Sequence, residues 1–375
     1  MSEAEMSLEP TKDVGSTGSD IASNNRSSFS KGSGLSLPAW ATRRRLAVAL
    51  GVIWFIDGLL QLQPYMFTKG FVTGIILPNT SGQPQPLASS ISAMAHFVQP
   101  HILFWNILFA VVQLAIGVGL VLRRTVKVTI IAAVIWSLLV WWVGEGFGGI
   151  LTGTASLVTG APGAVILYAL LGIFAWPSRS ADHAGAMSMA ETEERSERAD
   201  VVSMRSLRVL WAVIWGIFAL FFVLPANLHS DALSQMVAGG AQGEPGFIAS
   251  MDHSVAHLIA GDGFALSILL AVVCVAVAAG AFLEWRLAKW LLGIGALLVL
   301  VCWVVGQNFG GVLTGQGTDP NAGPLVLLYA LVLAGSMAWR SRWSNYELIP
   351  EERTKRAKQV LGGPAWYGRS SFADR

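Results

Sequence analysis

Charged residues are scarce in this 375-residue chain. Asp, Glu, Lys and Arg together make up 13% of it, whereas hydrophobic residues make up 53% and tryptophan occurs 15 times. Soluble domains carry about twice this share of charge. The scarcity of charge therefore excludes an ordinary soluble protein and predicts an integral membrane protein whose surroundings are the lipid bilayer, with no nucleic acid as a partner.

Cysteine is nearly absent, and so are the common signatures of catalytic sites. Cys274 and Cys302 both fall within apolar stretches, where cysteine is a small apolar filler more often than part of a disulfide or a metal site. The sequence has no phosphate-binding loop, dinucleotide fingerprint, zinc-ligand spacing or nucleophile elbow. Catalysis of the kind that soluble enzymes perform therefore has no visible site, and whether the chain is an enzyme stays open.

Long apolar runs, in contrast, are abundant. Eight stretches of roughly 17–22 residues carry few charges and are long enough for a bilayer core of about 30 Å. We expect an all-α integral membrane protein with eight transmembrane helices, as two parallel four-helix repeats, at residues 46–63, 102–122, 126–143, 160–176, 207–224, 263–283, 287–305 and 322–339.

The basic residues predict the orientation. If the N-terminus is cytoplasmic, every one of the 25 Lys and Arg residues except Lys69 falls on the cytoplasmic side of these spans. This is a strong positive-inside bias. We therefore expect a multi-pass protein of the plasma membrane with both termini in the cytoplasm, and outer segments at 64–101, 144–159, 225–262 and 306–321.

The same reading divides the chain into five parts. The first 42 residues are polar and low in complexity, with no secretory signal, which is typical of a disordered tail. We expect a disordered cytoplasmic tail (1–42), a first repeat (43–177), a mixed-charge cytoplasmic linker (178–206), a second repeat (207–340) and a cytoplasmic C-terminal tail (341–375).

An internal duplication supports the two repeats. A shift of 161 residues aligns Pro64 with Pro225 and His96 with His257, and it pairs LYAL at 167–170 with LYAL at 328–331. Each unit would hold four spans, and an even number of crossings leaves both units in the same orientation, as in transporters built from parallel repeats.

A glycine-rich phrase occurs once in each unit. It reads GEGFGGILTG at 144–153 and GQNFGGVLTG at 306–315. A packed turn at the outer end of a span is the first interpretation, since glycine lets backbones approach closely; a loop that lines a pore or coordinates an ion with its carbonyls is the second. The repeat-motif residues are Gly144, Phe147, Gly148, Gly149, Thr152, Gly306, Gln307, Phe309, Gly310, Gly311 and Thr314.

Two acids in or near the predicted spans are candidate site residues. Asp57 lies in the first span and Glu145 at the outer end of the third, whereas their repeat equivalents are Phe218 and Gln307. An acid near hydrocarbon is costly and usually marks function, although Glu145 could also face the outer water. Gln61 lies one turn after Asp57 on the same helix face, so we expect a polar cavity around Asp57 that opens outward.

Histidines gather in the outer segments. His96, the equivalent of His257, lies just before the second span and completes the candidate polar site of Asp57, Gln61 and Glu145. His253 and His257 have the i, i+4 spacing that places two imidazoles on one helix face, where they could bind an outer-face metal. Hydrogen-bonding caps are the alternative, and haem is disfavoured because no span holds a histidine in its middle.

The first span and its surroundings resemble a known family. A unit that opens with RLAVALGVIWFIDGLLQLQP at 45–64 and ends in three further spans is similar to the DoxX-like four-helix membrane proteins, which include the small subunit of thiosulfate:quinone oxidoreductase. The resemblance covers 43–177 and 205–340 and implies a tandem fusion of two such units. It also implies proximity to quinones or thiols and a partner membrane or redox protein, but no residue matches a family active-site pattern.

Three functional hypotheses follow. The first is a redox-associated or accessory role with a polar site open to the outer face; the resemblance implies action with a partner enzyme or a quinone, and the cofactor itself stays open between a quinone and an outer-face metal. The intramembrane acid favours a proton- or cation-coupled transporter of a small solute that uses Asp57. A structural membrane scaffold is the third.

Overall fold

The computed structural model describes residues 42–177 and 203–361, with side chains up to Ser341. Almost all of the predicted N-terminal tail and of the linker, and the end of the C-terminal tail, lie outside the described residues. The linker was expected to reach residue 206, but helix α8 already begins at Met204, and helix α13 continues to Leu361 within the expected C-terminal tail.

The described residues form helices and no β-strand, so the all-α prediction is confirmed for them. The α-helices are α2 (Arg43–Leu60), α3 (Gln85–Val98), α4 (Ile102–Val121), α5 (Val126–Val143), α6 (Ala164–Phe174), α8 (Met204–Phe222), α9 (Ala232–Gly240), α10 (Gly246–Leu258), α11 (Gly263–Gly280), α12 (Trp285–Val304) and α13 (Ala322–Leu361). The shorter helical turns include η1 (Pro64–Phe67), η2 (Phe71–Ile76), η5 (Gly146–Thr152), η6 (Leu157–Thr159), η9 (Pro225–Leu228) and η10 (Asn308–Thr314).

Within residues 42–177 and 203–361, six helical runs are long and apolar enough to cross a membrane, which indicates a multi-pass membrane protein. They are Gln85–Val121, Val126–Val143, Met204–Phe222, Gly263–Gly280, Trp285–Thr314 and Ala322–Ser341. Helix α2 is not among them, because its 18 residues include three arginines and Asp57.

The predicted span at 160–176 is shorter in the structure. Helix α6 has 11 residues, from Ala164 to Phe174, and a helix of this length rises by about 16 Å, roughly half of a bilayer core. Residues 160–163 form a turn instead, in which Gly160 and Gly163 have φ values of 91° and 102°. The apolar composition of this segment predicted a continuous span and carried no information on the turn at residues 160–163.

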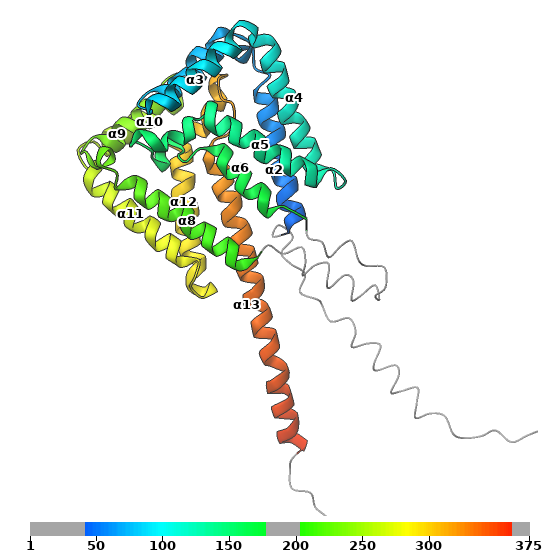
Figure 1. Ribbon diagram of the computed structural model, residues 1–375. Coiled ribbons are helices and arrows are strands. Elements are labelled where there is room, and N and C mark those ends of the chain that lie inside the picture. Colours follow the sequence, from blue (N-terminus) through cyan, green and yellow to red (C-terminus); the bar gives the residue numbers. More distant parts are fainter. Residues whose placement is uncertain (1–41, 178–202, 362–375) are drawn as a thin grey trace, which may run out of the picture. The chain divides into compact units, whose positions relative to one another are not determined.

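The helices pair in the same way in residues 42–177 and in residues 203–341, which we call the first and second halves. Helix α2 packs on α4 and α5 packs on α6 in the first half, and α8 packs on α11 and α12 on α13 in the second (Figure 1). Helices α6 and α13 contact each other. The last helix of each half therefore lies where the halves meet.

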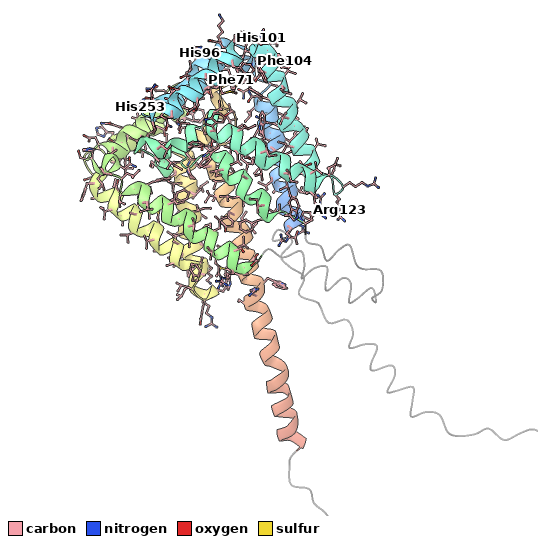
Figure 2. All side chains as sticks on the ribbon, in the orientation of Figure 1. Phe71, His96, His101, Phe104, Arg123 and His253 are labelled. Atoms are coloured by element: carbon pink, nitrogen blue, oxygen red, sulfur yellow. The ribbon has the colours of Figure 1, made fainter. Side chains whose placement is uncertain are left out.

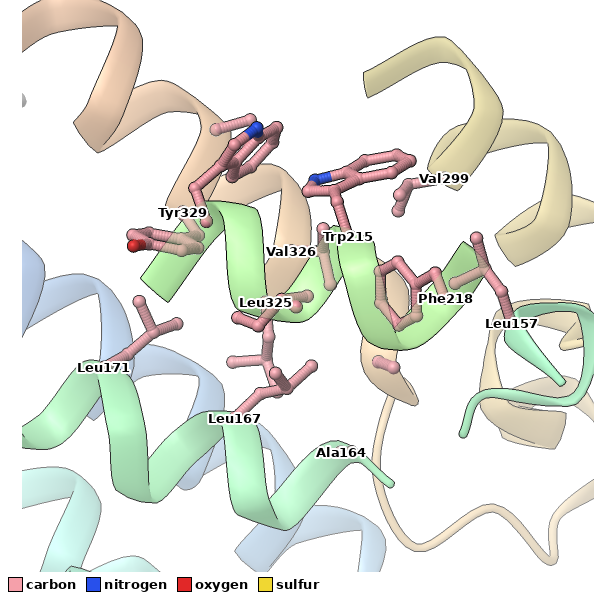
Figure 3. Close-up of a cluster of buried hydrophobic side chains, with 14 of the residues drawn as sticks. Leu157, Ala164, Leu167, Leu171, Trp215, Phe218, Val299, Leu325, Val326 and Tyr329 are labelled. Atoms are coloured by element: carbon pink, nitrogen blue, oxygen red, sulfur yellow. The ribbon is translucent and has the colours of Figure 1, made fainter. Parts of the chain in front are cut away.

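The apolar core surrounds this meeting point. Leu167 and Leu171 of α6 lie near Leu325 and Tyr329 of α13, and Trp215 and Phe218 of α8 complete the cluster (Figure 3). The rings of Phe174 and Tyr329 stack with centroids 6.1 Å apart. Because lipid is as apolar as this core, close packing, and not removal from water, stabilises such contacts inside a membrane.

Other apolar side chains point away from the protein. Leu103 of α4, Val128 of α5, Leu269 of α11 and Trp290 of α12 are each more than half exposed. A soluble protein does not display this much contiguous apolar surface. These helices are suited to contact lipid.

The orientation can be tested with single cysteines at matched positions of the two glycine phrases. Leu151 and Leu313 are about half exposed, so Leu151→Cys and Leu313→Cys are accessible to a membrane-impermeant maleimide. The background carries Cys274→Ala and Cys302→Ala, which remove two buried thiols. Because the basic residues predict cytoplasmic termini, both positions should be labelled in intact cells.

Arg123→Cys provides the control, since Arg123 follows α4 whereas His101 precedes it, at the opposite end of the helix (Figure 2). This cysteine should react only in inverted membrane vesicles. Labelling of Leu151→Cys or Leu313→Cys from the cytoplasmic side would contradict the orientation.

Candidate functional site

The two glycine phrases fold into the same left-handed turn. Residues 146–149 have φ values of 52°, 57°, 62° and 69°, and residues 308–311 have 47°, 56°, 75° and 64°. This left-handed conformation costs a non-glycine residue about 1–2 kcal/mol. Five of these eight residues are glycine. The backbone conformation therefore explains why both phrases are rich in glycine.

Each turn packs directly against the backbone that precedes the last helix of its half. A Cβ atom on Gly148 would lie 2.0 Å from the carbonyl oxygen of Pro162, and one on Gly310 would lie 2.1 Å from that of Asp319. The indole Nε1 of Trp141 also donates to the Pro162 oxygen, at 2.7 Å, and so helps to hold this oxygen in place.

The remaining motif residues complete the turn. Phe147 packs edge-on against Trp141 with centroids 4.9 Å apart, and Phe309 packs on Trp303 at 5.0 Å. Thr152 Oγ1 donates to the Gly149 carbonyl at 2.7 Å, as Thr314 Oγ1 does to that of Gly311 at 2.6 Å. These contacts account for the motif as a packed turn.

Glu145 and Gln307, which occupy the second position of the two phrases, each cap a helix. Glu145 Oε1 accepts from the backbone nitrogens of Ala164 at 2.9 Å and Val165 at 3.3 Å, at the start of α6. Gln307 Oε1 accepts from Gly323 N at 3.3 Å, near the start of α13. The first N–H groups of a helix need such acceptors, so an amide can replace the carboxylate here.

The amide also gives Gln307 a donor that a carboxylate lacks. Its Nε2 donates to the Leu157 carbonyl of the first half at 2.8 Å. Glu145 instead keeps Oε2 without a partner. Gln307 therefore links the two halves by a hydrogen bond, whereas Glu145 keeps a carboxyl oxygen without a hydrogen-bond partner.

Asp57 is buried and held by one hydrogen bond. It is 3% exposed, and its Oδ2 accepts from the hydroxyl of Tyr168 on α6 at 2.6 Å. Its Oδ1 has no partner. One turn further, Gln61 donates through Nε2 to Asn106 Oδ1, and Asn106 Nδ2 donates back to the Gln61 carbonyl at 2.9 Å.

Asp57 lines a cavity of about 280 Å³ among α2, α3, α4 and α5. Most of the lining is aromatic or aliphatic, and the polar exceptions cluster together. These are Asp57, Gln61, Gln113, Glu145, Thr318 and Asp319. Asp319 comes from the second half, so this site needs both halves. Among the described residues that line the cavity, none is basic.

A second cavity, of about 330 Å³, is mainly polar and adjoins the first. Backbone of the glycine turns, together with Asn79, Thr159, Gln307 and Asn321, makes up much of its wall. The two cavities share Gly144, Glu145, Thr318 and Asp319. Glu145 and Asp319 thus stand where a polar cavity meets an apolar one.

The environment of these two carboxyls favours their protonated forms. Burial raises the pKa of Glu145, and the nearby Asp319 carboxyl raises that pKa further. Burial also raises the pKa of Asp319, although Asn321 N and Thr318 Oγ1 donate to it at 2.7 and 3.0 Å. Two neighbouring acids without a basic partner hold protons more readily than isolated ones.

The structure brings together only part of the predicted site. Asp57, Gln61 and Glu145 line one cavity. His96 lies on an exposed position of α3 and lines neither cavity, and His253 is exposed on α10 (Figure 2). His257 is also exposed on α10. Within residues 42–177 and 203–341, no three His, Cys, Asp or Glu side chains gather closely enough to hold a metal ion.

Sequence reasoning missed Asp319, Asn106 and Gln113. Asn106 and Gln113 lie two helical turns apart on one face of α4, a polar stripe in an apolar helix that could have been recognised. Asp319 lies in an outer segment, where an acid is ordinary. Only the tertiary structure shows that it lines the same cavity as Asp57.

No protein-family model, curated protein or solved structure matches this chain.

The glycine turn can be tested with two neighbouring substitutions. Gly148→Ala places a methyl group against the Pro162 oxygen, whereas a Cβ on Gly149 has no atom closer than 3.8 Å. Both pay the cost of positive φ, about 1–2 kcal/mol, but only the first adds a clash of about 1–3 kcal/mol. Thermal unfolding in detergent should show a clearly larger loss for Gly148→Ala. Equal losses would contradict the packed turn.

The raised pKa of Glu145 predicts a pH-dependent stability. An acid with a raised native pKa binds protons more strongly in the folded state, so it lowers stability as pH rises through the unfolded value of about 4.3. Glu145→Gln keeps the cap, as Gln307 does, and removes this loss. The variant should gain stability over the wild type at pH 7 and much less at pH 4, in thermal unfolding at both pH values. A gain independent of pH would refute the account.

Proposed function

We propose that the protein is a proton- or cation-coupled transporter of a small solute, and that Asp57 binds the coupled ion. One observation carries the proposal: Glu145 and Asp319 line both the polar cavity and the apolar cavity that contains Asp57. The three carboxyls thus form a series that leads from a polar compartment to a buried site.

The charge of the site supports a moving cation. Asp57 is buried with one oxygen unpartnered, and no basic residue among those described lines its cavity. A buried carboxylate without a counter-charge is strongly disfavoured. A proton or a cationic solute has to neutralise the Asp57 carboxylate. In a transporter the proton and the solute would occupy Asp57 in turn.

The proposal includes the topology. We propose eight crossings in two parallel units of four, with both termini in the cytoplasm of a plasma-membrane protein. Helix α2, and α6 together with the turn at residues 160–163 before it, join the six long apolar runs. The matched helix pairs and the matched left-handed turns support the two units. Helix α2 would rise by about 27 Å over its 18 residues.

A quinone-binding accessory of DoxX-like type is the second candidate. The aromatic lining of the Asp57 cavity, which includes Trp54, Trp105 and Trp136, favours it because a quinone ring can stack there. Electron transfer would then take place with a partner redox protein. Purified protein that retains a quinone through detergent extraction would support this candidate.

The transporter is tested by proton movement in proteoliposomes loaded with a pH-sensitive dye. The panel of solutes covers amines, carboxylic acids, sugars, neutral alcohols and short-chain quinones. At least one solute should move protons beyond the signal from protein-free liposomes. Asp57→Asn should abolish this movement, while the isosteric side chain keeps an acceptor for Tyr168.

Asp262→Asn is the matched control, because Asp262 is an exposed acid in the loop before α11. It should leave the proton movement unchanged. Absence of proton movement with every solute, or full movement in Asp57→Asn, would sink the transporter. If both substitutions altered stability alone, a structural scaffold would be the better description.

A further inference from the structure

We infer that the Asp57 cavity takes a small protonated amine with an aromatic body, and that the ammonium group donates to the free oxygen of Asp57. The inference names the solute class of the site and rests on the proposed function for the solute's movement across the membrane. Three features of the cavity carry it: its unpartnered atoms, its charge and its aromatic wall.

The unpartnered polar atoms of the cavity favour a ligand that donates hydrogen bonds. Four described lining atoms have no hydrogen-bond partner: Asp57 Oδ1, Gln113 Oε1, Glu145 Oε2 and Trp136 Nε1. The unpartnered oxygens of Asp57 and Gln113 are acceptors, whereas Trp136 Nε1 is a donor. Asp57 and Gln113 are only 3% and 8% exposed, so water in the surroundings does not easily satisfy them. A buried acceptor without a donor is costly, and a primary ammonium brings three N–H donors.

The charge of the cavity favours a cationic ligand. Asp57 lines the cavity, no basic residue among the described lining residues offsets its carboxylate, and neither Glu145 nor Asp319 supplies a positive charge. A carboxylate ligand would add a negative charge, and a neutral quinone could accept from Trp136 Nε1 but offers no donor to Asp57 Oδ1 or Gln113 Oε1. A cation that donates hydrogen bonds meets both needs.

The aromatic wall of the cavity favours a ligand with a flat, apolar ring. Phe109 contacts Trp136, Trp105 and Phe71 with ring centroids 5.6, 6.1 and 6.5 Å apart, so the rings form one continuous surface. Such faces attract cations and pack against rings. The volume of about 280 Å³ limits the body to a single ring with a short chain.

The test compares three ligands of similar shape on the detergent-purified full-length protein. The probes are 2-phenylethylamine, which is protonated at pH 7; 2-phenylethanol, which is neutral; and 2-phenylethyltrimethylammonium, which is a cation without N–H groups. Calorimetry should give at least tenfold tighter binding for the amine than for either analogue. Equal binding of the amine and the alcohol, or no amine binding at millimolar concentration, would overturn the inference.

Two substitutions locate the binding. Asp57→Asn should weaken the amine at least tenfold, and Asp262→Asn should leave its affinity unchanged. Gln113→Leu, which removes a second acceptor at similar volume, should weaken it several-fold and keeps the test valid if Asp57→Asn fails to fold. Amine affinity that is unaltered in the folded variants would place the amine outside this cavity and overturn the assignment.

The failure of this inference is distinguishable from failure of the transporter. Asp57-dependent proton movement with a solute of another class, without amine binding, would keep the transporter and remove the amine. Asp57-dependent amine binding without proton movement would keep the site and its ligand class and remove the transport.

Discussion

The hydrogen bonds from Glu145 to the start of α6 connect the parts of this site. Glu145 follows the end of α5, directly precedes the left-handed turn and caps α6 through the backbone nitrogens of Ala164 and Val165. Helix α6 then carries Tyr168, whose hydroxyl holds Asp57. The Glu145 carboxyl thus sets the position of the helix whose Tyr168 holds Asp57, and its remaining oxygen has no hydrogen-bond partner.

The second half has matching helix pairs and a matching left-handed turn, but its side chains differ at the positions of the candidate site. Gln307 caps α13 as Glu145 caps α6, but Phe218 stands in place of Asp57 and is fully buried against Trp215. Tyr329, the equivalent of Tyr168, donates to the Leu207 carbonyl. At these positions the second half therefore packs or makes hydrogen bonds, whereas Asp57 and Glu145 of the first half each keep one carboxyl oxygen without a partner.

Polar contacts join the halves through their loops. Asn227 donates to Ala155 O at 2.8 Å, Gln63 donates to Gly317 O at 3.1 Å, and Gln307 reaches Leu157 O. Between apolar helices in lipid there is little hydrophobic force, so such hydrogen bonds and close packing carry specificity. They also fix the loop that brings Asp319 to the Asp57 cavity.

The sequence by itself determined the membrane-spanning character and much of the helix register, because apolar length and turn residues act locally; α5 occupies 126–143 as expected. It also singled out Asp57, Gln61 and Glu145, since acids and amides in apolar runs are conspicuous in one dimension. The tertiary structure decided what they contact. The cap made by Glu145, the turn at 160–163, the exposed position of His96 and the arrival of Asp319 from a distant loop depend on backbone conformation and on packing between segments far apart in the chain. Neither hydrophobic period nor residue spacing encodes those contacts, so only the folded chain shows that the acids share one site.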